Sequence, residues 1–415
     1  MKKIKEIANE CLNCKVKPCC LKGCPIKTQI PEFITELKNE NYKKAYDILQ
    51  ENNICSYICS LVCPQEEQCE GSCVKGIKGE PVNIGLLEKK VNEWAIENGY
   101  EYKIEKKENN GKKVGIIGSG PAGLACAAEL LKEGYEVEVY EKDKIPGGIL
   151  IYGIPDFRLS KDKVEIVIDN LKDLGANFIT NKELGKDFSL EELSKKYDAV
   201  FLAIGATKST TYSLSDDEIT GVYKSDEFLK AYNENKFIEN LGNVVVIGGG
   251  NVAMDSARTA IKMGAKSVKI LYRRDRAHMP AREIELDEAI EDGVEFKELV
   301  RVVSANTQNG KIESVNCIRT EIKDGKAVDS ENSEIYKVEA NTVVFAIGLK
   351  PDKKLIQEQG IELDEWGYIK IDENGKTNLE NVFAGGDNTE SKSTVCRALA
   401  AGKKGAQGII KLINL

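Results

Sequence analysis

The feature that most constrains the fold is a strand, a glycine-rich turn and a helix, which occur in this order twice. In the first copy an apolar strand at 114–117 runs into Gly-Ser-Gly-Pro-Ala-Gly at 118–123, and a helix pattern follows. In the second copy a strand at 244–247 runs into Gly-Gly-Gly-Asn-Val-Ala at 248–253, again before a helix pattern. Each copy continues into another apolar strand. This β-α-β order predicts open parallel sheets and therefore an α/β fold.

The two copies also end alike, which indicates two related units and not an array of short repeats. The stretch DAVFLAIG at 198–205 is similar to TVVFAIG at 342–348. A polar stretch at 103–113 has the composition of a linker between the N-terminal region and the first copy. With 415 residues, the chain is long enough for about two or three domains.

The first glycine turn predicts a dinucleotide-binding site. Its glycines allow a tight turn and let the backbone approach a pyrophosphate, while the helix N-terminus supplies N–H donors. The strand after the helix ends in Glu141, where a carboxylate can bind a ribose hydroxyl. The motif fits FAD and NAD equally, and a purely structural turn is the alternative. The candidate residues are Gly118, Gly120, Pro121, Ala122, Gly123 and Glu141.

The second glycine turn predicts a dinucleotide site with a different preference. The strand after its helix ends in Tyr-Arg-Arg-Asp-Arg at 272–276, which holds three of the nine arginines of the chain. Because guanidinium groups bind phosphate in a bidentate manner, this end favours the 2′-phosphate of NADP(H). Asp275 lies within this cluster and could bind a ribose hydroxyl, so NAD(H) is the alternative nucleotide. A solvated charge cluster is the structural alternative. The candidate residues are Gly248, Gly250, Asn251, Val252, Ala253, Asp255, Arg273 and Arg274.

Two dinucleotide sites in one chain suggest a flavin enzyme. A flavin takes a hydride from a nicotinamide and can release single electrons, and the protein holds the two rings together. This chemistry needs no acid–base side chain, in agreement with a single histidine, His278. We therefore predict no catalytic side chain.

Cysteine is concentrated near the N-terminus, where ten of the 13 cysteines precede residue 74. They form two runs, at 11–25 and 59–73, and each run contains a Cys-Pro pair. Close thiolates with Cys-Pro are typical of ferredoxin-like ligand runs, so we expect two [4Fe–4S] clusters. Two zinc sites in a non-catalytic scaffold are the first alternative, and disulfides are the second. Cys126, Cys317 and Cys396 have no nearby cysteine partner; Cys126 is expected in the core.

Charge and hydropathy exclude other classes of protein. The net charge of −8 shows no basic footprint for nucleic acid. No run of 18 apolar residues is present, so we expect no membrane span. The basic start MKKIKE leads into polar residues and not into the apolar core of a secretory signal. We expect a cytoplasmic protein, in which crowded cysteines are metal ligands before they are disulfides.

The order of these motifs resembles the small (β) subunit family of NADPH-dependent glutamate synthase. The resemblance covers nearly the whole chain and rests on the cysteine region, GSGPAG, GGILIYGIPDFRL, GGGNVAMD, YRR, MPAR and AGGD. The flavin and iron–sulfur subunits of electron-bifurcating NADH-dependent ferredoxin:NADP oxidoreductases look similar, as does the N-terminal half of dihydropyrimidine dehydrogenase. The family implies an N-terminal helical iron–sulfur domain followed by two Rossmann-like domains, the NADPH domain being inserted in the FAD domain. The implied boundaries are 1–108 for two [4Fe–4S] clusters, 109–208 with 345–415 for FAD, and 209–344 for NADPH.

The resemblance assigns FAD to the first turn and implies ligands for both clusters. Its further FAD contacts are Gly147, Gly148, Gly205, Gly386, Asp387, Thr394 and Val395. One cluster would be held by Cys11, Cys14, Cys19 and Cys73, and the other by Cys24, Cys63, Cys69 and Glu88. The spacing before Cys24 is one residue longer than in the family, so Cys20 is a rival of Cys19. A solvent-facing helix charge is the alternative for Glu88, and Cys59 is expected beside a cluster without binding it.

The resemblance also implies a partner subunit and therefore a hetero-oligomer. In glutamate synthase the partner is the large subunit, which makes glutamate from glutamine and 2-oxoglutarate. In the bifurcating relative it is a ferredoxin-linked flavin subunit. Since no glutaminase or 2-oxoglutarate site is visible in this chain, we expect it to make no glutamate alone.

Overall fold

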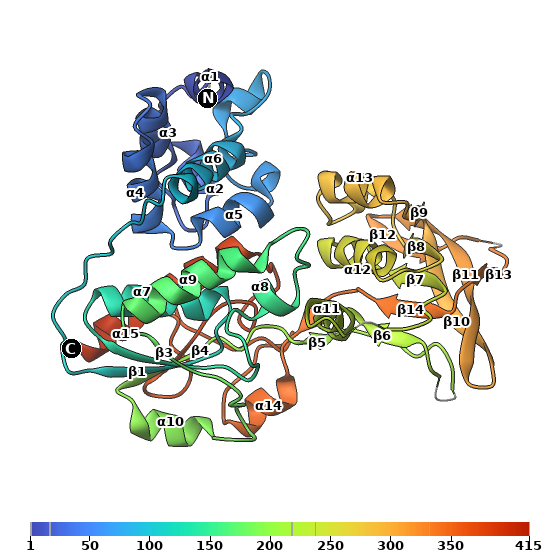
Figure 1. Cartoon of the computed structure of the whole chain (residues 1–415). Coiled ribbons are helices and arrows are strands. Elements are labelled where there is room, and N and C mark those ends of the chain that lie inside the picture. The colour runs from blue at the N-terminus through green and yellow to red at the C-terminus, as the bar shows by residue number, and fades with distance from the viewer. Residues whose placement is uncertain (1, 16–17, 217–218, 237, 332, 415) are drawn as a thin grey trace. The chain divides into compact units, whose positions relative to one another are not determined.

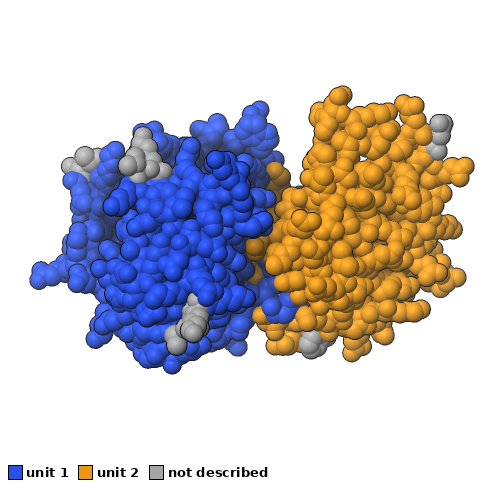
Figure 2. Space-filling view, turned by 90° about the horizontal axis from the view of Figure 1, so that it is seen from above, with its two compact units in different colours: residues 1–151, 157–206, 351–415 blue, residues 152–156, 207–350 orange. Residues whose placement is uncertain are grey.

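The computed structural model describes residues 2–15, 18–216, 219–236, 238–331 and 333–414. Two compact units are present, coloured separately in Figure 2. The first comprises 1–151, 157–206 and 351–415, and the second comprises 152–156 and 207–350. The second unit is therefore an insertion in the sequence of the first. The expected boundaries of three domains stay a prediction.

The N-terminal part of the first unit is helical, as the blue end of the chain in Figure 1 shows. Its apolar core contains Phe33, Ile58 and Leu87, whose side chains are fully buried. Its helices are α1 (Lys2–Asn9), α2 (Cys19–Gly23), α3 (Ile30–Lys38), α4 (Tyr42–Asn52), α5 (Ser56–Val62) and α6 (Ile84–Glu97), with short 3₁₀ turns at Gln65–Glu67 and Val74–Ile77. These helices position both cysteine runs.

The rest of the first unit is built on a five-stranded parallel sheet with the order β16-β4-β1-β2-β3. The strands are β1 (Lys113–Ile117), β2 (Glu136–Tyr140), β3 (Asn177–Ile179), β4 (Ala199–Leu202) and β16 (Val382–Ala384). The helices are α7 (Pro121–Lys132), α8 (Ile149–Tyr152), α9 (Lys161–Asp173), α10 (Leu190–Lys196), α14 (Lys353–Glu358) and α15 (Val395–Ile413). The chain steps to opposite sides of β1, and in open sheets this reversal is where ligands bind.

The second unit contains a parallel sheet of the order β6-β14-β7-β8-β9 and a separate antiparallel sheet. The parallel strands are β6 (Val222–Lys224), β7 (Asn243–Ile247), β8 (Ser267–Tyr272), β9 (Glu295–Glu298) and β14 (Thr342–Phe345). The antiparallel strands are β10 (Val300–Gln308), β11 (Lys311–Lys323), β12 (Lys326–Asp329) and β13 (Tyr336–Glu339). The helices are α11 (Ser225–Asn233), α12 (Asn251–Lys262) and α13 (Glu283–Glu291), with a 3₁₀ turn at Arg276–His278. At its ends, β5 (Lys208–Ser209) pairs with β15 (Leu349–Lys350) in the antiparallel sense.

The predicted α/β class is confirmed, and the two glycine turns lie where the sequence places them. Both helices begin earlier than predicted, at Pro121 and Asn251, because Gly120 and Gly250 are their N-cap residues. The last residues of each motif therefore belong to the first helical turn, where backbone N–H groups remain unpaired within the helix. None of the described helices is long and apolar enough to cross a membrane.

Candidate functional site

The first glycine turn is shaped by close backbone contacts. Gly118 has φ +99°, and a Cβ there would lie 2.3 Å from the carbonyl oxygen of Ala203. A Cβ on Gly123 would lie 2.0 Å from the carbonyl oxygen of Gly118. Gly120, in contrast, has open space around its Cβ position and stands at the start of α7. The turn is thus closed toward the sheet and open where an anion could meet the helix N-terminus.

Glu141 fixes this turn from the end of β2. Its buried carboxylate accepts hydrogen bonds from the Ser119 backbone (3.1 Å), the Ser119 hydroxyl (2.5 Å) and the Asp143 backbone (2.9 Å). The Ser119 hydroxyl oxygen accepts a bond from the Gly147 backbone at 2.9 Å. A Cβ on Gly148 would lie 2.9 Å from the Gly120 Cα. The structure therefore brings Glu141, Gly147 and Gly148 to the first turn.

The C-terminal candidates follow β16 or stand at the start of α15, and Gly386 reaches the first turn. Gly386 has φ +93°, and a Cβ on it would lie 2.9 Å from the Cβ of Ala122 in α7. Burial and the nearby Glu390 raise the pKa of Asp387 to about 6. Thr394 is the N-cap of α15 and accepts a hydrogen bond from the Arg397 backbone, so Val395 is the first helical residue.

Gly205 follows β4 in the left-handed region, with φ +67° and open space around it. It lies two residues beyond Ala203, whose carbonyl oxygen packs against Gly118. Most of the predicted FAD residues thus meet at the carboxyl edge of the first sheet, where β1 and β4 both end. They are Gly118, Gly120, Gly123, Glu141, Gly147, Gly148, Gly205 and Gly386. Pro121 and Ala122 occupy the buried first turn of α7 at the same edge.

The second glycine turn repeats the first with one difference. Gly248 has φ +151°, and a Cβ there would lie 2.2 Å from the Ala346 carbonyl oxygen. Gly250 is the N-cap of α12, and the Asn251 side chain accepts a hydrogen bond from the Arg282 backbone at 2.9 Å. The third position, where the first turn requires glycine, is Ala253, which is fully buried. Val252 and Asp255 lie in the first turns of α12, and Asp255 is buried.

The arginines after β8 differ in their ion pairs. Arg276 lies 2.8 Å from Glu283 and 2.8 Å from Asp287. In the part of the chain that the structure describes, no carboxylate pairs with Arg273 or Arg274. Two guanidinium groups are therefore available for an anion at this strand end.

The acid beside these arginines is already engaged. Asp275 contacts the ring Nδ1 of His278 at 2.6 Å and accepts a hydrogen bond from its backbone at 3.0 Å. These contacts lower the pKa of Asp275. The Asp275 carboxylate thus caps the 3₁₀ turn at Arg276–His278.

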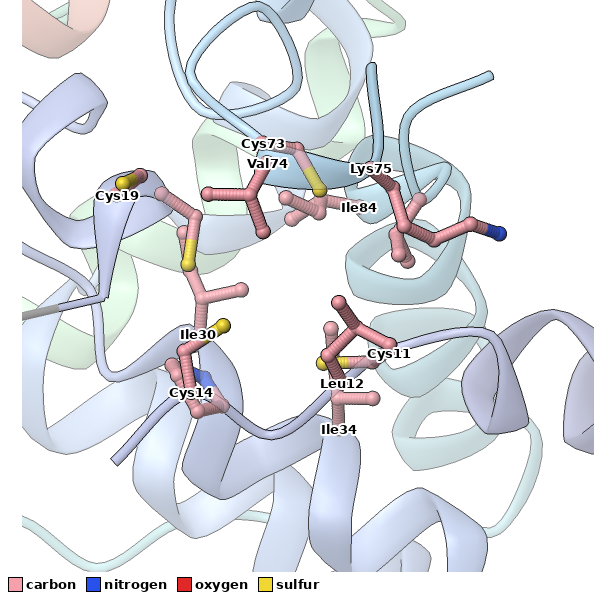
Figure 3. Close-up of a pocket in the computed structure, with 13 residues that line it drawn as sticks. Cys11, Leu12, Cys14, Cys19, Ile30, Ile34, Cys73, Val74, Lys75 and Ile84 are labelled. Carbon is pink, nitrogen blue, oxygen red and sulfur yellow. The ribbon is translucent and has the colours of Figure 1, made fainter. Parts of the chain in front are cut away.

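The first cysteine pocket gathers residues from the N-terminal run and from Cys73 (Figure 3). It is lined by the predicted Cys11, Cys14, Cys19 and Cys73, by the rival Cys20, and by apolar side chains that include Ile30, Ile34 and Ile84. The five cysteines are half-buried. Burial raises the pKa of Cys20 to about 11.

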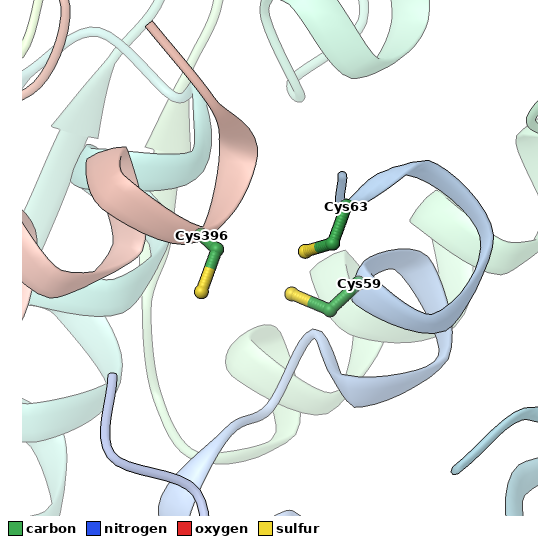
Figure 4. Close-up of side chains that lie close together, drawn as sticks. All are labelled: Cys59, Cys63 and Cys396. Carbon is green, nitrogen blue, oxygen red and sulfur yellow. The ribbon is translucent and has the colours of Figure 1, made fainter. Parts of the chain in front are cut away.

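The second cysteine pocket is more deeply buried and has an unexpected member. It is lined by the predicted Cys24, Cys63, Cys69 and Glu88, and also by Cys59 and Cys396. Glu88 is 9% exposed and so does not face solvent; burial, with Cys24 and Cys396 nearby, raises its pKa. The Sγ atoms of Cys59, Cys63 and Cys396 all lie within 4.8 Å of one another (Figure 4). Sequence reasoning missed Cys396 because no neighbouring cysteine marks it.

Two nucleotide turns on related sheets, together with an N-terminal region of cysteine-lined pockets, define a pyridine-nucleotide-dependent flavin oxidoreductase with an iron–sulfur domain. Residues 112–405 match the family model of pyridine nucleotide-disulphide oxidoreductases. Residues 1–100 match the family model described as dihydropyrimidine dehydrogenase domain II, 4Fe-4S cluster. The predicted class of enzyme is thereby confirmed.

The small chain of NADPH glutamate synthase from Escherichia coli K12 is 35% identical over 98% of this chain and 91% of its own length. This chain belongs to the glutamate synthase small-chain family of NADPH-dependent flavin and iron–sulfur oxidoreductases. The β subunit of an NADPH-Fe(3+) oxidoreductase from Geobacter sulfurreducens is 32% identical over 94% of this chain and 63% of its own length.

Among solved structures, Mycobacterium tuberculosis FprA in complex with NADPH has a TM-score of 0.63. It covers 73% of this chain and 85% of its own, at 21% identity. This likeness shows the shared α/β fold.

Proposed function

We propose that this chain is the electron-transferring subunit of a larger cytoplasmic oxidoreductase, most simply a glutamate synthase. In this proposal NADPH gives a hydride to FAD, and single electrons pass through two [4Fe–4S] clusters to a partner subunit. The observation that carries it is the position of α15. Its first residues, Thr394 and Val395, are candidate flavin contacts, and its next residue, Cys396, lines the second cysteine pocket.

The residues of the first turn fit FAD. The open side of Gly120 and the N-terminus of α7 would bind the diphosphate, together with Gly118, Gly123 and Gly386. Glu141 would accept a ribose hydroxyl, and Asp387 would meet the ribityl chain. The walls of the FAD site would be formed by Gly147, Gly148, Gly205, Pro121 and Ala122. The backbone of Thr394 and Val395 would face the flavin ring.

The residues of the second turn fit NADPH. The N-terminus of α12 would bind the diphosphate through the turn that comprises Gly248, Gly250, Asn251, Val252 and Ala253. Asp255 would stabilise that helix from its buried side. Arg273 and Arg274 would hold the 2′-phosphate, because Arg276 is already paired and Asp275 is engaged by His278. This distribution of charge supports NADPH over NADH.

The two cysteine pockets fit thiolate-bound iron. Cys11, Cys14, Cys19 and Cys73 would hold the first cluster, with Cys20 at its edge. Cys24, Cys63 and Cys69 would contribute to the second, for which the family pattern adds Glu88. Soft thiolate donors suit iron–sulfur clusters and zinc alike, but only the former can accept electrons from a flavin.

The partner follows from the relatives. A glutamate synthase small chain implies a large subunit that uses the electrons to make glutamate. The Geobacter relative, named for the reduction of Fe(3+), favours a second candidate in which a different partner, such as a ferredoxin-linked flavin subunit, receives them. In either case a hetero-oligomer is the functional form.

Anaerobic purification followed by cofactor analysis tests the proposal. We expect about eight irons and about eight acid-labile sulfides per chain, one FAD, and bleaching of the FAD spectrum by NADPH. Affinity capture from the native cell would identify the partner. Glutamate should form from glutamine and 2-oxoglutarate only when a large subunit is added. Stoichiometric zinc without iron, or glutamate formation by the isolated chain, would contradict the proposal.

A further inference from the structure

The second cysteine pocket holds more iron-binding groups than one cluster needs. Its lining includes five thiols and the Glu88 carboxylate, whereas a [4Fe–4S] cluster commonly binds through about four protein ligands. Cys24, Cys63 and Cys69 account for three of them under the function proposed above. The fourth must come from Glu88, Cys59 or Cys396.

Cys396 is placed to reach this cluster. Its side chain is 2% exposed at the start of α15, and the thiols of Cys59 in α5 and of its C-cap residue Cys63 point toward it (Figure 4). The three Sγ atoms lie within 4.8 Å of one another. Cys59 lies one helical turn before Cys63, which is the C-cap residue of α5, so both thiols reach the pocket from the same element. Cys396 instead approaches from a different element.

Hydrogen bonds hold α15 against the segments that carry the other ligands. The Gln68 side chain, next to Cys69, donates to the Thr394 hydroxyl at 3.4 Å. Further along α15, Lys403 donates to the backbone oxygen of Asn52 at 2.7 Å and to its side-chain oxygen at 3.0 Å. The approach of Cys396 to the pocket is thus built into the packing of α15.

Thiolate is the better ligand for this site. Irons in iron–sulfur clusters prefer soft thiolate sulfur to carboxylate oxygen. We propose that Cys396 takes the place of Glu88, so that Cys24, Cys63, Cys69 and Cys396 hold the second cluster. The helix that begins at the candidate flavin contacts then supplies a bond to iron.

Iron content and electron paramagnetic resonance of the full chain, purified anaerobically, test this inference. In Cys396→Ala we expect the loss of about one iron from about eight, a [3Fe–4S] signal after oxidation, and a changed spectrum of the reduced second cluster. Cys396→Ser should retain the iron with a shifted midpoint potential, because a hydroxyl oxygen can replace a lost ligand. Glu88→Ala should keep the iron and the spectrum of the unmodified chain.

The matched control is Cys55→Ala, because Cys55 is a buried cysteine at the start of α5 and lines neither pocket. FAD content and circular dichroism of each variant confirm that it is folded. Full iron with an unchanged spectrum in Cys396→Ala, or loss of iron in Glu88→Ala, would overturn the assignment. So would a Cys396→Ser variant that behaves like Cys396→Ala. If the unmodified chain itself lacks clusters, the proposed function fails first, which distinguishes the two.

Discussion

The two nucleotide-binding units share one backbone design and differ in the charge that ends their second strand. In the first unit this strand, β2, ends in the buried acid Glu141, which is bound to the turn through Ser119. In the second unit β8 ends in Arg273 and Arg274, which pair with no carboxylate among the described residues. The same fold is thus specialised by a few side chains at one edge.

The third position of the turn adds a second difference. Gly123 lies so close to the Gly118 carbonyl that no side chain fits, whereas the second unit accommodates Ala253. This difference indicates that α7 approaches its turn more closely than α12 approaches the corresponding turn. Four experiments test this comparison of the two units.

The largest effect is expected for the arginines. Replacing both Arg273 and Arg274 with alanine should raise the KM for NADPH about 100-fold, because two charge-assisted contacts to the 2′-phosphate are lost. The KM for NADH should change little. Steady-state reduction of an artificial acceptor with each nucleotide measures this. Arg276→Ala is the control, since Arg276 is bound to Glu283 and Asp287. An equal increase in the KM for NADPH and for NADH would show that the arginines do not bind the 2′-phosphate.

The next effect concerns the third position of the turn. Gly123→Ala should lower the free energy of unfolding by about 3 kcal/mol and release FAD, because the added methyl group meets backbone. The reverse change in the other unit, Ala253→Gly, should cost about 1 kcal/mol. Denaturant titration and the FAD content of each variant check the pair. A similar decrease in the free energy of unfolding of both variants would mean that the two helices approach their turns equally closely.

A smaller effect is expected at the end of β2. Glu141→Gln keeps the size of the side chain but removes the charge that holds Ser119, so the Kd for FAD should rise about tenfold. Titration of the apoprotein with FAD measures it. Asp275→Asn is the counterpart in the second unit and should leave the KM for NADPH within about threefold. An unchanged Kd for FAD would exclude Glu141 as a ribose ligand.

The smallest effect is a pH dependence of the apoprotein. Burial and Glu390 raise the pKa of Asp387 from 3.8 to about 6 in the folded state. The protonated form is therefore favoured by folding, and this contribution, about 1 kcal/mol after allowance for partial exposure, is lost as pH rises from 3.8 through about 6. Unfolding curves across this window should show the loss, and Asp387→Asn should abolish it. The prediction is wrong if the free energy of unfolding of the unmodified chain rises over this window relative to that of Asp387→Asn.

The sequence predicted the strand, turn and helix of each unit well, because the pattern of each element lies in a short continuous stretch of residues. The strand predicted at 114–117 lies within β1, and the one at 244–247 lies within β7. The antiparallel strands β10 to β13 were not foreseen. Their pattern of half-buried residues, as in β10, gives a weaker periodic signal than a buried parallel strand.

The cysteine pockets show the limit more clearly. The resemblance to the family implied Cys11 and Cys14 for one cluster and Cys63 and Cys69 for the other, and each pair lines one pocket. Cys396 enters the second pocket from a helix more than 300 residues away. Only the packing of α15 against the N-terminal helices reveals it, and no local motif encodes that contact.

The pairing of β5 with β15 has a consequence for how such enzymes diversify. Lys208–Ser209 and Leu349–Lys350 run side by side, so the long segment of the second unit, 207–350, is entered and left at one place. Neighbouring strands lie about 5 Å apart, a gap that a very short loop can close. Replacement of the stretch between them could therefore exchange the second glycine turn and the arginines after β8 without moving the ends of the first unit.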